Sequence, residues 1–235
     1  MQDVAYILRF FRVVSPIPPL MTGTFGVVSA VAATAVMFDP ARASGAIAPV
    51  LLLQLFAASS GFGAPARRGH YDLLLTRGVG RTGVALAHWT VSIAPGVASW
   101  IGIAVVEFVA SRGHRVALLA SGTWAAVGLV STLPWALNVA LPRFASGIGW
   151  LLVLVTATTT FSRPVIGEWT VGSTQVEALV WPAWVFLISP LGAVGRSLGW
   201  SEMLAVAPAL TIAVGAMVIA SRWAARADVP LEASQ

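Results

Sequence analysis

Long runs of uncharged, mostly apolar residues alternate along this chain with short segments that carry the charged residues. A transmembrane helix needs about 20 such residues, and runs of that order occupy 21–38, 46–64, 83–106, 116–141, 144–162 and 203–221. A shorter run, 178–191, contains two prolines, so we expect a re-entrant or interfacial helical segment on the outer face, between spans 5 and 6. The pattern predicts an all-α integral membrane protein with six transmembrane helices in a single domain, 1–235.

The first residues of the chain follow a different pattern. Apolar positions recur there with helical spacing, and two arginines lie between them: Val4, Ile7, Leu8 and Phe11 with Arg9 and Arg12. Such a segment predicts an N-terminal amphipathic helix that lies in the membrane interface. The alternative is that these residues form the first turns of a longer first span.

Composition supports the membrane class and limits the chemistry. The chain is 57% hydrophobic and only 10% charged, and its mean hydropathy is +0.85, whereas soluble domains carry about 25% charged residues. All 14 basic residues are arginine, so the chain lacks the lysine of a phosphate-binding loop. If ATP drives this protein, another chain hydrolyses it. The absence of cysteine excludes disulfides, thiolate metal sites and thiol nucleophiles.

The arginines also predict orientation, because cytoplasmic loops are enriched in positive charge. With six spans and residues 67–81 inside, nine arginines are cytoplasmic: Arg9, Arg12, Arg67, Arg68, Arg77, Arg81, Arg143, Arg222 and Arg226. Five are outside: Arg42, Arg112, Arg115, Arg163 and Arg196. A seventh span would make the split seven against seven. We therefore expect a multi-pass protein of the plasma (inner) membrane with both termini cytoplasmic. Because the arginines are scattered over many loops, we expect no nucleic acid partner.

Residues 67–81 form a basic island between the second and third spans. Within it, Tyr71, Leu74 and Leu75 have i, i+3, i+4 spacing and share one face of a short helix that lies between Gly69 and Gly78. An apolar face on a basic loop is costly to leave in water and suits the groove of a partner protein. The alternative is a solvated loop whose arginines only fix the topology.

The island resembles the loop after the second span in the permeases of type-two ABC exporters, which commonly reads Arg-Gly-Thr-x-Glu-Leu-Leu-Leu-x-x-Pro-Val-Ser-Arg. Here residues 68–81 read Arg-Gly-His-Tyr-Asp-Leu-Leu-Leu-Thr-Arg-Gly-Val-Gly-Arg, so Asp72, Gly78 and Gly80 replace the family's glutamate, proline and serine. Six spans, an interfacial N-terminal helix and a re-entrant outer segment also look like that family.

This resemblance implies that the island is a cytoplasmic coupling helix. It would dock on an ABC ATPase through Arg68, Gly69, Tyr71, Asp72, Leu73, Leu74, Leu75, Arg77, Gly78 and Arg81. It also implies a second permease chain, in a homodimer or a similar heterodimer, surrounded by membrane lipid. No cofactor is bound by this chain, because ATP and Mg belong to the partner ATPase.

Few polar residues fall inside the spans, and each has two interpretations. His88, Gln54 and Asn138 either hold helices together through hydrogen bonds or line a substrate path. Glu107 is expected at the interface, since it lies about one span length from the start of the third run. Pro95-Gly96 and Pro134 predict kinks. We expect no catalytic residues and no metal site, because His70, His88 and His114 are isolated in the sequence.

These features favour a transporter subunit rather than an enzyme. The leading hypothesis is a permease in which ATP hydrolysis by a separate ATPase moves an apolar or amphipathic substrate, such as a lipid, drug or peptide. The alternatives are a secondary transporter driven by an ion gradient, for which intramembrane carboxylates are usual, and a non-transporting membrane anchor or regulatory subunit.

Overall fold

The computed structural model describes residues 19–60, 80–114, 116–140, 151 and 190–226, and every regular element among them is helical. The longer helices are α2 (Pro19–Phe38), α4 (Ala48–Ser60), α7 (Arg81–Ala110), α8 (Ser121–Ala140) and α12 (Trp200–Arg226). The short ones are η1 (Pro40–Arg42), α3 (Ala43–Ala46), η2 (Ala117–Leu119) and η3 (Pro190–Ala193). The predicted α-helical class is confirmed for this part of the chain.

Four helical segments of the described chain are long and apolar enough to cross a bilayer: Leu20–Phe38, Pro40–Ser59, Thr82–Ala110 and Ser121–Ala140. They correspond to the first four apolar runs of the sequence. The 13 residues of α4 are too few to span a bilayer alone. The preceding turns, η1 and α3, extend this segment to 20 residues.

The remaining predicted elements are described in part or not at all. The sixth run, 203–221, lies within the 27-residue helix α12. The N-terminal helix, the coupling helix at 69–78, the fifth run at 144–162 and the segment 178–189 lie outside the described residues. Only the end of the outer segment, which includes η3, can be placed.

The fourth run is not one helix. Residues 117–119 form η2, and Ala120 has extended backbone angles (φ −64°, ψ 152°) before α8 begins at Ser121. The predicted span 116–141 was therefore wrong at its start, because the first residues of this run form a tight turn that packs against α7. Its last residues agree with the end of α8 at Ala140.

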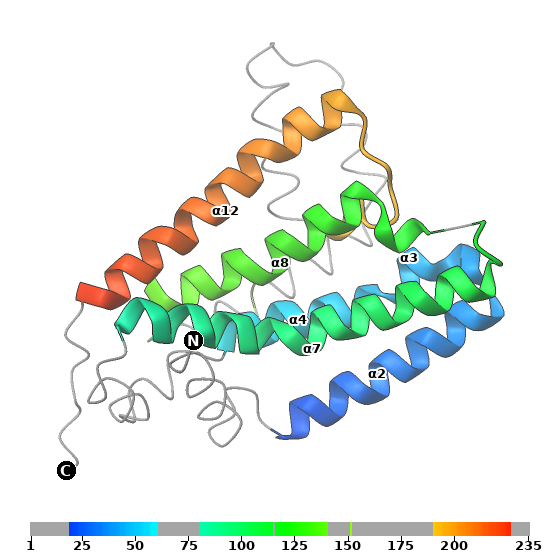
Figure 1. Ribbon diagram of the computed structural model, residues 1–235, viewed down its shortest axis with the longest axis horizontal. Helices are drawn as coiled ribbons and strands as arrows, with labels where there is room; N and C mark the ends of the chain where they lie inside the picture. The colour runs from blue at the N-terminus through cyan, green and yellow to red at the C-terminus, as the bar shows by residue number, and fades with distance from the viewer. Residues whose placement is uncertain (1–18, 61–79, 115, 141–150, 152–189, 227–235) are drawn as a thin grey trace.

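The long helices form a fan in which α8 occupies the middle (Figure 1). It packs between α12 on one side and α4 on the other, and α7 packs against α4, α2 and α12. Buried positions make up 72% of the α8 span but only 17% of the α2 span. The apolar surface of α2 is thus largely uncovered in the described part of the chain, as expected of a helix that faces lipid.

The bundle has two ends, which we name after one residue at each. At the Arg81 end, α7 and the last turns of α4, α8 and α12 meet in a small cluster of buried residues: Ala58, Ala85, Trp135, Ala136, Val139 and Ala220. At the Glu107 end, the last turns of α2 and α7 meet α3, η2, the start of α8 and η3. The end of α4 at Ser60 and the start of α7 at Arg81, which flank residues 61–79, both lie at the Arg81 end.

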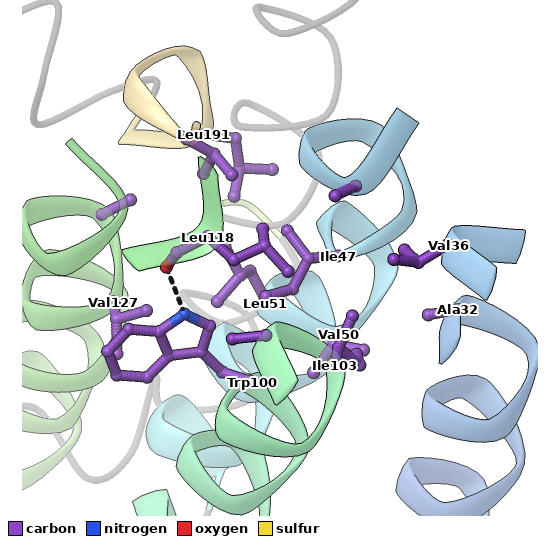
Figure 2. Close-up of a cluster of buried hydrophobic side chains, with 14 of the residues drawn as sticks. Ala32, Val36, Ile47, Val50, Leu51, Trp100, Ile103, Leu118, Val127 and Leu191 are labelled. Atoms are coloured by element: carbon purple, nitrogen blue, oxygen red, sulfur yellow. Dashed lines mark hydrogen bonds between the residues drawn. The ribbon is translucent and has the colours of Figure 1, made fainter. Parts of the chain in front are cut away.

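The larger core fills the Glu107 end (Figure 2). Ile47 and Leu51 contribute from the α3–α4 segment, Ile103 from α7 and Leu118 from η2, all with at most 1% of their surface exposed. The indole N–H of Trp100 donates a 2.8 Å hydrogen bond to the carbonyl of Leu118, shown as the dashed line in Figure 2. Between helices in a bilayer, close packing and such hydrogen bonds stabilise the structure more than removal from water does.

Helix α7 ends in a hydrogen-bonded C-terminal motif. The N–H of Gly113 donates to the carbonyl of Phe108 (2.8 Å), and the N–H of Arg112 donates to that of Val109 (3.1 Å). This pair of bonds requires a left-handed residue at the first position after the cap, where glycine is usual. Arg112 occupies it with φ 53°.

Candidate functional site

The structure describes only the residues that flank the candidate docking segment. Residues Arg68, Gly69, Tyr71, Asp72, Leu73, Leu74, Leu75, Arg77 and Gly78 lie outside the described part of the chain. Arg81 is the first residue of α7, and Gly80 precedes it in an extended conformation (φ −60°, ψ 139°). No side chain caps the start of α7. Gly80 is therefore the described residue that connects this segment to α7.

The described charged residues are distributed unequally between the two ends. Arg81 and Arg222 lie at the Arg81 end, together with Arg226 at the last position of α12. The acidic residues of the described chain lie toward the other end: Asp39, Glu107 and Glu202. Three further arginines, Arg42, Arg112 and Arg196, also lie at the Glu107 end. The arginines of the described chain are therefore divided equally between the two ends, and only the acidic residues are confined to one.

A belt of polar side chains joins α4, α7 and α8 within and beside the cluster at the Arg81 end. His88 of α7 is fully buried, and its Nδ1 lies 3.4 Å from the hydroxyl of Ser92 and 3.4 Å from the indole nitrogen of Trp135 on α8. Because an indole N–H can only donate, Nδ1 is the acceptor in the contact with Trp135. His88 therefore joins α7 to α8.

Two further bonds in this belt connect helices. The side-chain amide of Asn138 on α8 donates to the backbone carbonyl of Ser59 on α4, and the indole N–H of Trp89 on α7 donates to the carbonyl of Ser131 at 3.1 Å. Asn138 has 1% of its surface exposed. Since α8 takes part in both bonds, it is the centre of the belt.

Gln54 of α4 is the third polar residue singled out from the sequence, and its environment differs. It has 1% of its surface exposed, and its amide packs against the backbone of Gly96, directly after Pro95 in α7. A side chain at residue 96 would collide with Gln54, whose Cγ lies 3.0 Å from the position of the missing Cβ. Neither its oxygen nor its nitrogen has a hydrogen-bond partner among the described residues.

Gln54, His88 and Asn138 thus lie buried on three helices that pack against one another, α4, α7 and α8. Two of the three form hydrogen bonds between helices, as the interhelical interpretation expects. Whether they also line a substrate path remains a prediction.

The environment of Glu107 differs from the one predicted from the sequence. Its side chain was predicted at the interface, but it is fully buried. Oε1 accepts the N–H of Ala117 and Oε2 accepts the N–H of Leu118, each at 2.9 Å. Burial is possible because both carboxylate oxygens receive donors. The length of the apolar run could not predict this burial, because it does not show that η2 folds back onto the end of α7.

The turn around η3 is fixed to α8 by a second set of polar groups. The hydroxyl of Thr123 accepts the N–H of Gly195 (2.9 Å), and that of Ser121 accepts the N–H of Leu198 (2.9 Å). Gly122 donates its N–H to the carbonyl of Arg196 (3.0 Å). A side chain on Gly122 would collide with the backbone of Ala193. The Ser-Gly-Thr sequence at the start of α8 is therefore a docking site for this turn.

The described residues contain no group of three or more His, Cys, Asp or Glu side chains that could hold a metal ion. His88 is buried near the Arg81 end, and His114 is exposed after the end of α7. His70 lies outside the described chain.

Taken together, the apolar helices and their buried polar contacts define an α-helical membrane protein that crosses the bilayer several times. Comparison of the chain with protein-family models, with curated proteins and with solved structures finds no match.

Proposed function

We propose that this chain is the transmembrane permease subunit of an ATP-driven exporter of the type-two ABC class. The observation that carries the proposal is the sequence of residues 68–81, an arginine-flanked apolar segment that joins α4 to α7. A separate cytoplasmic ATPase would bind it and supply the free energy. The substrate would be an apolar or amphipathic molecule, such as a lipid, drug or peptide.

The position of α7 supports this role. It starts at Arg81, immediately after the segment, and runs 30 residues through the bundle, about 45 Å at 1.5 Å per residue. It packs against α2, α4 and α12. A displacement of the docking segment would therefore pass into α7 and from there to three other helices.

The surroundings of the buried ionisable residues favour this reading over a transporter driven by an ion gradient. Ion-coupled transporters usually rely on intramembrane carboxylates that can bind and release the ion. Glu107 has both oxygens engaged by backbone N–H groups. Nδ1 of His88 is engaged by the indole N–H of Trp135. Each of these groups has a structural partner that ion binding would displace.

In the proposed assembly, two ATPase subunits bind ATP and Mg, and a second permease chain, identical or similar, completes the membrane part. The exposed apolar residues of α2 and α12, such as Val27, Val31 and Ile219 with 65 to 70% exposure, are suited to lipid or to that second chain. In this scheme the Arg81 end faces the cytoplasm.

Co-purification tests the docking step. A tagged chain solubilised from its native membranes should retain an ATPase that hydrolyses ATP. Leu74→Glu places a carboxylate on the apolar face of Tyr71, Leu74 and Leu75, and we expect about 10-fold less bound ATPase, because burial of an unpaired charge is costly. Thr76→Glu adds the same charge away from that face and should retain the ATPase. Equal recovery from both variants would contradict the proposal.

Orientation can be tested separately. The chain has no native cysteine, so Thr76→Cys provides a single thiol in the docking segment. A membrane-impermeant maleimide should label it only after the cells are permeabilised. Labelling of intact cells would place the segment outside and exclude contact with a cytoplasmic ATPase.

A further inference from the structure

Gln54 is a primary amide at the middle of the bundle whose hydrogen-bonding capacity is unused. It has 1% of its surface exposed, and neither Nε2 nor Oε1 has a partner among the described residues. A buried amide left in this way is costly, and the cost is greater within a bilayer, where water cannot serve as the partner. A second arrangement in which Gln54 is bonded would therefore be favoured at this position.

The structure contains a group suited to bond with it. Pro95 lies at the fifteenth position of the 30-residue α7 and has no backbone N–H. The carbonyl of Val91 consequently lacks the donor that residue 95 would provide in a regular helix, and it points along α7 toward residues 95 and 96. The side chain of Gln54 packs against Gly96, the residue after Pro95, with Oε1 as its nearest atom. The donor that Gln54 leaves unused and the acceptor that Pro95 leaves without its helical donor thus belong to two helices that pack together at this proline.

We propose that α7 is hinged at Pro95 and that Gln54 is the latch of this hinge. In the arrangement described above, the latch is open. In the second arrangement, a bend of α7 brings the Val91 carbonyl to Nε2 of Gln54, which donates a hydrogen bond to it. Gly96 is required because any side chain there would keep Gln54 away from the α7 backbone.

The contacts of α7 indicate which half moves. In the half of α7 that follows Pro95, Trp100 and Glu107 form hydrogen bonds with η2. In the same half, the hydroxyl of Ser99 lies 2.7 Å from that of Ser29 on α2. The half before Pro95 is bonded instead to α8, through His88 and Trp89. Opening and closing of the latch would therefore move residues 81–94 relative to α2. This inference concerns the chain alone and does not rest on the proposed function.

Distance measurements between two spin labels test the hinge. The chain has no native cysteine, so Leu20→Cys on α2 and Leu86→Cys on α7, at positions 84% and 38% exposed, provide the only label sites. Leu86 is nine residues from Pro95, about 13.5 Å along the helix. A bend of about 20° would move it by about 5 Å. We expect two distance populations about 5 Å apart for the full-length chain in lipid nanodiscs, measured by double electron–electron resonance.

Two substitutions then assign the populations. Gln54→Leu removes the latch, and we expect the ratio of the two populations to change about five-fold or more, as loss of one hydrogen bond predicts. Pro95→Ala restores a backbone donor for Val91 and should leave a single population. Pro134→Ala in α8 is the matched control, which removes a proline from a neighbouring helix and should preserve both populations.

The outcomes are decisive even if one variant fails to fold. A single population in the chain with native Gln54 and Pro95 would overturn the proposal, and so would an unchanged ratio in Gln54→Leu. Should Pro95→Ala not yield folded protein by circular dichroism, the Gln54→Leu result decides alone.

Discussion

The buried carboxylate of Glu107 makes a strong prediction about stability. Its two oxygens accept the N–H groups of Ala117 and Leu118 at 2.9 Å, and the side chain is fully buried. Glu107→Gln preserves the shape of this side chain but replaces one acceptor oxygen with an NH₂ donor. One backbone N–H would then face a donor instead of an acceptor.

The magnitude follows from this geometry. A hydrogen bond to a charged group contributes about 1.5 to 3 kcal/mol, and a buried donor left without a partner adds a desolvation cost. We expect Glu107→Gln to lower the free energy of unfolding by about 3 kcal/mol. For a chain of this length, that corresponds to a decrease in Tm of about 6 to 12 °C. Thermal unfolding in detergent, followed by circular dichroism and by tryptophan fluorescence, measures it.

Asp39→Asn is the matched control, because it makes the same chemical change at the same end of the bundle. The side chain of Asp39 is 45% exposed, accepts the N–H of Ala41 at 3.1 Å and pairs with Arg42 at 2.9 Å. An exposed ion pair of this kind contributes about 0 to 1 kcal/mol. Glu107→Gln should therefore be several times more destabilising than Asp39→Asn. If the two effects are equal, the carboxylate of Glu107 does not fix η2 as described.

Three further substitutions test other contacts by the same measurement. Arg112→Gly should raise the stability by about 1 kcal/mol, because glycine adopts the left-handed conformation of residue 112 without strain. Gly122→Ala should lower it by about 1 to 3 kcal/mol, since the new methyl group collides with the backbone of Ala193. Asn138→Leu should cost about 1 to 3 kcal/mol by leaving the Ser59 carbonyl without its donor. An effect of opposite sign in any of the three would refute the corresponding contact.

Hydropathy alone predicted the helical class and most of the described helices. The first apolar run, 21–38, matches α2 within two residues at its start, and the third, 83–106, lies inside α7. Such runs are informative because a backbone in lipid must satisfy its own hydrogen bonds, so that a long apolar run has few alternatives to a helix. The charged loops between the runs limit where each helix can end.

What hydropathy could not predict depends on contacts between residues distant in the sequence. Gln54 and Gly96 are individually visible as a polar residue and a glycine, but their direct contact is a property of how α4 packs on α7. Glu107 appeared to be an interfacial residue because the ten residues that bring η2 back onto it have no distinctive pattern. The start of α8 was missed for the same reason, since the residues of η2 are as apolar as those of a span.

The two ends of the bundle are held by different interactions, and this difference bears on which end can move. At the Glu107 end, directional bonds from Glu107, Trp100 and Thr123 attach side chains to the backbone of the connecting segments η2 and η3. At the Arg81 end, bonds from His88, Trp89 and Asn138 join the helices directly to one another, beside a buried cluster that consists largely of alanines from four helices. Under the proposed function, a displacement that enters at the Arg81 end would therefore pass between α4, α7, α8 and α12, while the connecting segments hold the opposite end. A permease driven through a segment between α4 and α7 needs this asymmetry, because movement at the driven end must change the bundle without separating its connections at the other.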